Sequence, residues 1–149
     1  MAGTILVFAE QREGKLKKSV LEALGLARDL AAGGQVVALV VGDGIGPTAA
    51  DVARHGVDRV LVCDGPSLAL ASSEYLAPVI AAVRSEKPDL VIFPASALGR
   101  DLAPSLAARG GYPLLTECLG LVRAGEGFEA TKSMYGGKVI ATWRSAATP

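Results

Sequence analysis

A Gly-Arg-Asp triplet, Gly99-Arg100-Asp101, is the part of the sequence whose residue types best suit ligand chemistry. It follows an apolar run, Leu90–Phe93, that predicts a buried strand, and it precedes an Ala- and Leu-rich stretch typical of a helix. Open α/β sheets bind ligands beyond the carboxyl ends of their strands, where a glycine permits close backbone approach. The triplet is therefore either a nucleotide-binding corner or a structural one. In the structural interpretation, which we favour, Asp101 caps the helix and Arg100 pairs with an acidic neighbour such as Glu10.

Two other features could carry chemistry, and each has a simpler structural explanation. The glycine-rich loop Gly42–Gly46 lacks the Lys-Ser/Thr of a phosphate-binding loop and does not fit Gly-x-Gly-x-x-Gly, so we interpret it as a connection. The one histidine, His55, ends a short predicted helix with no cysteine, serine or acidic partner in a recognisable pattern, which indicates a surface or helix-capping role. We expect no catalytic residue and no metal site.

Four strand–helix units are predicted before Gly111. Apolar runs predict strands at Ile5–Ala9, Val36–Val41, Arg59–Cys63 and Leu90–Phe93. Helical spacing relates three apolar sets: Val20, Leu24, Ala27 and Ala31; then Leu76, Val79, Ile80 and Val83; and finally Leu102 and Leu106. Because crossovers between parallel strands are right-handed, we place the first strand between the second and the fourth. The loops after Ala9 and Pro94 should then lie side by side.

Capping residues predict where three of the helices begin. Thr48 is expected to cap a short helix that runs to His55, and Ser72 or Ser73 to cap the next helix. With Asp101 as the N-cap of the fourth helix, Pro104 falls in the first turn, where its missing N–H has no intrahelical acceptor. The alternative is a longer, kinked helix.

Beyond Gly111 the pattern changes to strands joined by turns. Strands are predicted at Leu114–Val122, Phe128–Met134 and Lys138–Trp143. The Gly-Gly pair of Tyr135-Gly136-Gly137 supplies the positive φ angles of a hairpin turn, which indicates antiparallel pairing. The predicted fold is α/β: a three-layer open sheet, mainly parallel and adenine-nucleotide-α-hydrolase-like, with a C-terminal antiparallel hairpin extension.

The composition and charge of the sequence limit the classes of partner that we expect. Of 149 residues, 50% are hydrophobic, and 15 basic residues balance 15 acidic ones, so neither nucleic acid nor an anionic membrane is an expected partner. No apolar run approaches the roughly 20 residues that span a bilayer. The first strand starts near Thr4, so we expect no signal or transit peptide and a cytoplasmic protein. Cys63 and Cys118 lack C-x-x-C spacing and are expected to be reduced, mostly buried thiols. We interpret the basic residues Lys15, Lys17 and Lys18 as a solvent-exposed face.

Three separated segments resemble the α subunit of electron transfer flavoproteins. Pro94–Arg109 resembles that family's Pro-Ala-Thr/Ser-Ala, Leu-Gly-Arg-Asp-Leu-Ala-Pro and Leu-Ala-Ala-Arg elements. Ile5–Lys17 resembles its first strand and Glu-x-x-x-Gly-x-Leu turn, and Met134–Ser145 its Tyr-Gly-Gly segment. One departure is Lys132-Ser133-Met134, where the family usually has Arg-Pro-x, so the charge persists without the planar guanidinium.

The resemblance implies an αβ heterodimer that carries one FAD and, on the β subunit, one AMP. It implies electron transfer from dehydrogenases, typically the acyl-CoA dehydrogenases of fatty acid β-oxidation, to a membrane quinone oxidoreductase. FAD would belong to a C-terminal half that lies beyond the 149 residues of this sequence. We therefore expect residues 1–144 to be the N-terminal domain, residues 145–149 to start a linker, and this part to be a non-enzymatic scaffold that binds no FAD.

Contacts with the β subunit are predicted around Met134, Tyr135 and Trp143, because exposed aromatic residues beside apolar neighbours are typical interface anchors. A buried, core Trp143 is the alternative. The isolated chain is then expected to form a weak, concentration-dependent dimer. A rival interpretation is a free-standing adenine-nucleotide-binding module of the universal-stress type, although the Gly-x-x-Gly-x(9)-Gly-Ser/Thr pattern of that class is not visible.

Overall fold

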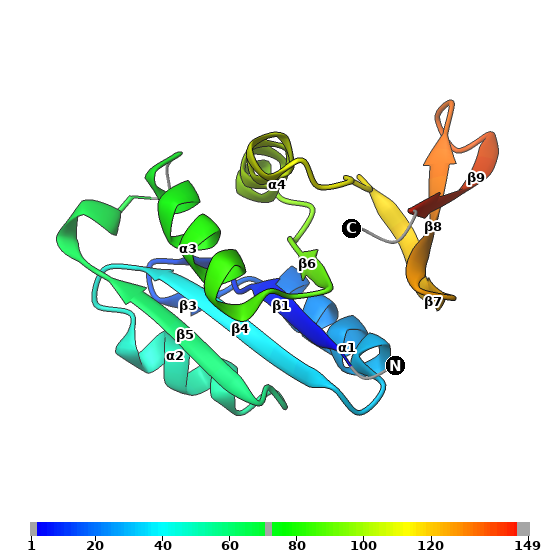
Figure 1. Cartoon of the computed structure of the whole chain (residues 1–149). Coiled ribbons are helices and arrows are strands. Elements are labelled where there is room, and N and C mark those ends of the chain that lie inside the picture. Colours follow the sequence, from blue (N-terminus) through cyan, green and yellow to red (C-terminus); the bar gives the residue numbers. More distant parts are fainter. Residues whose placement is uncertain (1–2, 71–72, 146–149) are drawn as a thin grey trace. The chain divides into compact units, whose positions relative to one another are not determined.

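The computed structural model describes residues 3–70 and 73–145. The chain divides into two compact units, Met1–Leu106 and Ala107–Pro149. The first contains the βα array and the second an antiparallel sheet (Figure 1). This is the predicted α/β class, with a mainly parallel sheet followed by antiparallel strands.

A four-stranded parallel sheet forms the centre of the first unit. Its order is β5-β4-β1-β6, which confirms that the first strand lies between the second and the fourth of the array. On β1, Ile5 is the register partner of Val36 on β4 and of Leu90 on β6. The strands are β1 (Thr4–Phe8), β4 (Gln35–Gly42), β5 (Arg59–Asp64) and β6 (Leu90–Ile92). The carboxyl ends of β1 and β6 therefore meet at the switch point of the sheet, which is the place where the strand order reverses.

Helices cover both faces of this sheet. Figure 1 shows α3 on the opposite side from α1 and α2. Side chains alternate between the two faces of a strand, so Leu6 and Phe8 join Val79 of α3 and Leu102 of α4 in one core cluster. The helices are α1 (Lys18–Ala31), α2 (Gly46–Ala53), α3 (Leu76–Glu86) and α4 (Ala97–Gly110), and two short 3₁₀ turns lie at η1 (Pro66–Leu68) and η2 (Ser73–Tyr75).

The apolar faces predicted for the helices are confirmed. Val20, Leu24, Ala27 and Ala31 are all buried in α1. Val79 and Val83 of α3 are buried, and Leu76 and Ile80 pack against the same core. In α4 the buried leucines are Leu102 and Leu106.

The predicted caps of two helices are wrong. Thr48 lies inside α2, where its hydroxyl donates to the Gly14 carbonyl at 2.8 Å, and the N-cap is Ile45 without a side-chain hydrogen bond. Helix α3 has Tyr75 as its N-cap, because Ser73 belongs to the preceding turn η2; Ser72 lies outside the described residues. The Tyr75 side chain is buried and its hydroxyl donates to the Leu68 carbonyl at 2.9 Å, which packs the turn onto the core.

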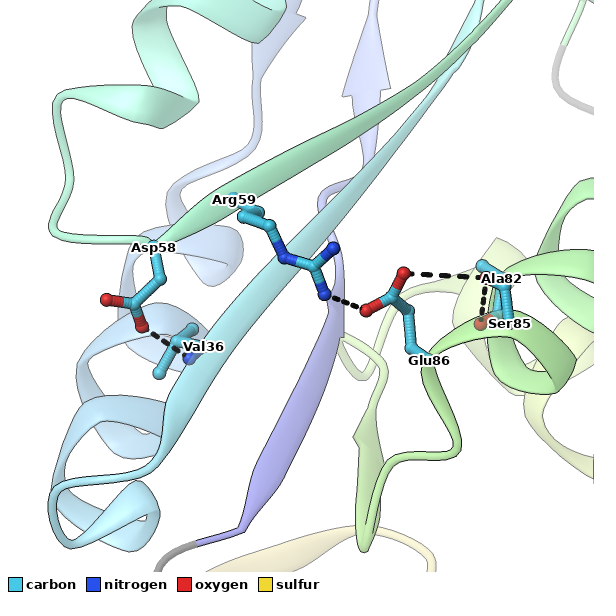
Figure 2. A network of polar contacts seen from close by, with 6 residues as sticks. All are labelled: Val36, Asp58, Arg59, Ala82, Ser85 and Glu86. Carbon is cyan, nitrogen blue, oxygen red and sulfur yellow. Dashed lines mark hydrogen bonds and ion pairs between the residues drawn. The ribbon is translucent and has the colours of Figure 1, made fainter.

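Polar contacts fasten the β5 edge of the sheet (Figure 2). The Asp58 carboxylate accepts the Val36 amide hydrogen at 2.7 Å, which ties the start of β5 to the start of β4. Arg59 pairs with Glu86 at the end of α3. The Ser85 hydroxyl lies 3.5 Å from Glu86 Oε1 and 3.1 Å from the Ala82 carbonyl oxygen. The Arg59 side chain is half exposed, whereas that of Glu86 is only 9% exposed, so water screens this pair from the arginine side alone.

The second unit contains a three-stranded antiparallel sheet in the order β7-β8-β9. Its strands are β7 (Cys118–Ala124), β8 (Gly127–Met134) and β9 (Val139–Ser145). The predicted hairpin is confirmed: Met134 pairs with Val139, and Tyr135, Gly136 and Gly137 turn with φ angles of 52°, 65° and 89°.

The strand boundaries in this unit differ from the prediction, by four residues at the start of β7 and by at most two elsewhere. The first strand begins at Cys118 rather than Leu114, after Glu117 with φ of 53°, a left-handed backbone that interrupts an extended chain. Ser145, the first residue of the predicted linker, is the last residue of β9, and its hydroxyl accepts the Phe128 amide hydrogen at 3.3 Å. The remainder of that predicted linker, residues 146–149, lies outside the described residues.

Candidate functional site

The switch point is occupied by the protein's own polar side chains. Glu10 follows β1 and is only 4% exposed. One of its carboxylate oxygens pairs with Lys17 Nζ at 2.5 Å, and the other accepts the hydroxyl hydrogen of Ser96, which follows β6. We call Glu10, Lys17 and Ser96 the switch-point cluster. It joins the end of β1 to the starts of α1 and α4.

The Gly-Arg-Asp triplet lies inside α4 and does not begin it. Helix α4 starts at Ala97, so the prediction that Asp101 is its N-cap is wrong, and the longer helix with Pro104 inside it is the observed one. The N-terminal contact comes from Ser96, whose Oγ accepts the Gly99 amide hydrogen at 3.0 Å. Gly99 is buried against the Pro94 carbonyl, whereas Arg100 and Asp101 are exposed. The pairing of Arg100 with Glu10 stays a prediction.

A short hairpin closes the space beside the cluster. Strands β2 (Gln11–Arg12) and β3 (Lys15–Leu16) pair antiparallel. The side chain of Gln11 donates to the Val41 carbonyl at 3.1 Å and accepts the Gly14 amide hydrogen at 3.0 Å. A Cβ on Gly42 would lie 2.5 Å from Gln11 Nε2, so the side chain rests directly on the end of β4. The family-like Glu-x-x-x-Gly-x-Leu segment thus fills the carboxyl end of the sheet.

Two amide donors of the glycine-rich loop bind a carboxylate of the protein itself. Asp64, at the end of β5, accepts the Gly44 amide hydrogen at 2.7 Å with one carboxylate oxygen and the Ile45 amide hydrogen at 3.2 Å with the other. These amides precede α2, where the helix dipole favours an anion. The Asp64 carboxylate of the protein itself therefore lies where a phosphate-binding loop would hold a phosphate. The loop connects elements, as predicted, and Asp64 fixes its conformation.

Removing the Asp64 carboxylate should destabilise the first unit. We expect Asp64→Ala to lower the free energy of unfolding by about 1 kcal/mol, the usual cost of losing an N-terminal capping acceptor. Asp64→Asn should lose less, because one acceptor oxygen remains. Urea denaturation followed by circular dichroism at 222 nm measures both. Asp43→Ala, in the same loop and exposed, is the control, and an equal loss in both variants would contradict the capping role.

His55 and Cys63 do not enter this site. His55 follows α2 and is partly exposed, but the prediction that it has no acidic partner is wrong, since its Nε2 lies 3.9 Å from the carboxylate of Asp51, four residues earlier in α2. Cys63 is partly buried on β5. Within residues 3–70 and 73–145, no three His, Cys, Asp or Glu side chains are grouped as metal ligands.

Cys118, expected to be mostly buried, is exposed instead. It belongs to β7 and is the register partner of Lys132 on β8. Partial burial of its sulfur raises the pKa of the Cys118 thiol, and the ammonium of Lys132 opposes that rise. The sign of the net shift means a protonated thiol at neutral pH.

The residues predicted to contact a partner lie on or beside the β8–β9 hairpin. Tyr135 is 75% exposed and Trp143 is 51% exposed, so the alternative of a core tryptophan is wrong. Met134, which directly precedes Tyr135, is half-buried. Further large apolar side chains of this sheet are exposed: Leu119, Val122, Val139 and Ile140. Such a concentration of exposed apolar side chains is typical of a protein-binding surface.

Sequence reasoning missed the two side chains that fill the strand ends, Asp64 and Ser96. Asp64 is the last residue of β5, and Ser96 lies in the short segment between β6 and α4. Because the carboxyl ends of parallel strands meet at one edge, a polar residue there is placed beside the loop of the neighbouring strand. That signal could have identified Asp64 as the partner of the Gly42–Gly46 loop, which follows β4 next to β5.

Comparison with known proteins gives a consistent result. The sequence profile described as "Electron transfer flavoprotein domain" matches residues 5–149. Electron transfer flavoprotein subunit alpha of Clostridium acetobutylicum is 37% identical over 143 residues, which are 93% of this chain and 43% of that protein. The protein of the same name from Bacillus subtilis is 30% identical over 141 residues, 94% of this chain and 43% of its own length. Subunit LctC of the lactate dehydrogenase (NAD(+),ferredoxin) of Acetobacterium woodii is 33% identical over 141 residues, 92% of this chain and 34% of that protein.

The chain thus spans about two fifths of the length of the two alpha subunits that it matches. Among the residues that the structure describes, no helix has the length and apolarity needed to cross a membrane.

Proposed function

The chain belongs to the electron transfer flavoprotein family, and from this premise we propose that it is the N-terminal scaffold of an α subunit, with a surface that binds the β subunit. In this role it is part of an electron carrier and performs no catalysis of its own. The proposal extends to residues 1–144 as its domain and to the cytoplasm as its location.

The observation that carries the proposal is the contrast between the two units. At the carboxyl ends of the parallel strands, Glu10 and Asp64 satisfy donors that a nucleotide would need, which favours a structural use of that edge. On the antiparallel sheet, by contrast, aromatic and aliphatic side chains are left in water. Exposing them costs free energy that a partner would recover, at about 25 cal/mol for each Å² of apolar surface covered. We therefore place the β-subunit contact at Met134, Tyr135 and Trp143.

FAD, in this proposal, is held by a C-terminal α domain beyond residue 149, and AMP by the β subunit. The assembled heterodimer would accept electrons from dehydrogenases such as acyl-CoA dehydrogenases and pass them to the respiratory chain. The names of the relatives support an electron-transfer role of this general kind, since they include a lactate dehydrogenase subunit as well as electron transfer flavoprotein subunits.

Association with a β subunit is the direct test. The 149-residue chain and the full α subunit are each mixed with the β subunit of the same flavoprotein. Gel filtration with light scattering then gives the molar masses of the products. We expect a one-to-one complex with the full α subunit and a weak, concentration-dependent dimer of the chain alone. The full α subunit staying free of the β subunit at micromolar concentration would overturn the proposal.

Flavin content is an independent check. After desalting, the isolated chain should be colourless, whereas the full α subunit with its partner should absorb in the visible as a flavoprotein does. Stoichiometric flavin on the 149-residue chain would contradict the proposal that FAD is held by a separate C-terminal domain.

A further inference from the structure

One face of the antiparallel sheet carries a pocket of about 180 Å³. Its base is Ala130 on β8, which is only 1% exposed, and its register partner Trp143 on β9 forms a wall. Cys118 and Lys132, the partners in the β7–β8 register, lie on the same face, since cross-strand neighbours share a face. The segment Leu114–Thr116, which precedes β7, completes the lining.

The size and lining of the pocket indicate its occupant. Small-molecule sites usually enclose about 300–1,000 Å³, so this pocket suits one side chain better than a cofactor. Leucine, alanine and indole surfaces favour an apolar group. On β9, Val139 is exposed and lies on the same face as Trp143, two pairs of residues along the strand. Well-packed pockets beside exposed apolar side chains are where partner anchors contribute most of the binding energy.

Lys132 gives the pocket a positive charge. It is the one charged residue of the pocket lining, and its Nζ lies 3.0 Å from Thr116 Oγ1 at the exposed rim. Its ammonium has room for further acceptors, because an ammonium donates three hydrogen bonds. The thiol of Cys118, protonated at neutral pH, adds no negative charge beside it. The opposite face of the sheet differs, because there Glu129 and Arg144 neutralise each other at 3.0 Å.

We propose that this pocket receives one apolar side chain of the β subunit, and that a carboxylate next to that side chain pairs with Lys132. The proposal rests on the proposed function and adds to it the chemistry of the contact. Filling the pocket or reversing its charge should then weaken assembly, while equivalent changes at exposed positions away from this face should not.

Two pairs of matched variants in the full α subunit test this. Cys118→Trp fills the pocket from an exposed position, and Thr142→Trp places the same side chain on the opposite face, where Thr142 pairs with Thr131 and is exposed. Lys132→Glu reverses the charge of the lining, and Lys18→Glu makes the same change at an exposed position of α1, in the first unit. The dissociation constant from the β subunit is measured by calorimetry, and circular dichroism confirms that each variant folds.

We expect Cys118→Trp and Lys132→Glu each to raise the dissociation constant at least tenfold, and both controls to change it less than about twofold. Lys132→Arg should restore binding, because it returns the charge. Assembly unaffected by Cys118→Trp and Lys132→Glu would overturn the pocket contact while leaving the scaffold function intact. An equal loss in the controls would overturn it as well, since the effect would then not belong to the pocket. Failure of the unaltered α subunit to bind would overturn the proposed function itself.

Discussion

Replacing Gly99 with alanine is expected to destabilise the first unit by roughly 3 kcal/mol or more, toward the upper end of what overpacking costs. Gly99 lies in the first turn of α4, buried against the end of β6. A Cβ built on it would lie 1.9 Å from the Pro94 carbonyl oxygen and 3.4 Å from Ser96 Oγ. The first distance is far inside any contact between carbon and oxygen, and the oxygen belongs to the backbone, so α4 or the strand end must move.

Gly25→Ala is the control for this prediction. Gly25 also lies in a helix, α1, but nothing lies within 4 Å of its added Cβ. Alanine is the better helix former by about 0.5–1 kcal/mol, so this variant should be neutral or more stable. Urea denaturation followed at 222 nm compares the two. Equal stability of the two variants would contradict the close approach of α4 to β6.

Replacing Glu10 with alanine is expected to cost about 2–3 kcal/mol, the second largest effect. The carboxylate is buried and accepts the Ser96 hydroxyl hydrogen while pairing with Lys17. Its loss leaves a hydroxyl without its acceptor and an ammonium without its counterion beside a buried strand end. The cost stays below that of a fully buried pair, because Lys17 is 40% exposed and can turn to water.

The variants Glu10→Gln and Glu129→Ala define the cause. Glu10→Gln keeps an acceptor for Ser96 and loses the charge, so it should cost about half as much. Glu129→Ala removes the ion pair with Arg144, whose side chains are 31% and 68% exposed, and should cost less than about 0.5 kcal/mol. If Glu10→Ala also proves this mild in chemical denaturation, the switch-point cluster does not stabilise the strand ends.

Much of the fold was predictable because its signals are local. The apolar runs of β1, β4 and β5 and the helical spacing of Val20, Leu24 and Ala27 depend on residues a few positions apart. Handedness of the crossovers then places β1 between β4 and β6 without knowledge of any contact. The hairpin at Tyr135–Gly137 follows from two glycines that permit positive φ angles. The motifs that resemble electron transfer flavoprotein α subunits are likewise short stretches of sequence.

The start of α4 shows where local reasoning fails. Asp101 is a good capping residue and its choice would put Pro104 in the first turn, so propensity favours a helix that begins after it. The helix begins at Ala97 instead, because the Ser96 hydroxyl is held by Glu10, which follows β1, and its Oγ accepts the Gly99 amide hydrogen. The contact spans 86 positions of sequence, and no window of neighbouring residues contains it.

By itself the sequence determined the types of the elements, their order in the sheet and the family to which the chain belongs, since each depends on short patterns and on the handedness of the backbone. Only the tertiary structure decided which donors each carboxylate meets: Glu10 with Ser96 and Lys17, and Asp64 with the amides before α2. It also decided that Trp143 is exposed and that Ala130 and Lys132 share a pocket with the segment before β7. These outcomes depend on strand register and on what packs above each face, which are properties of residues distant in sequence.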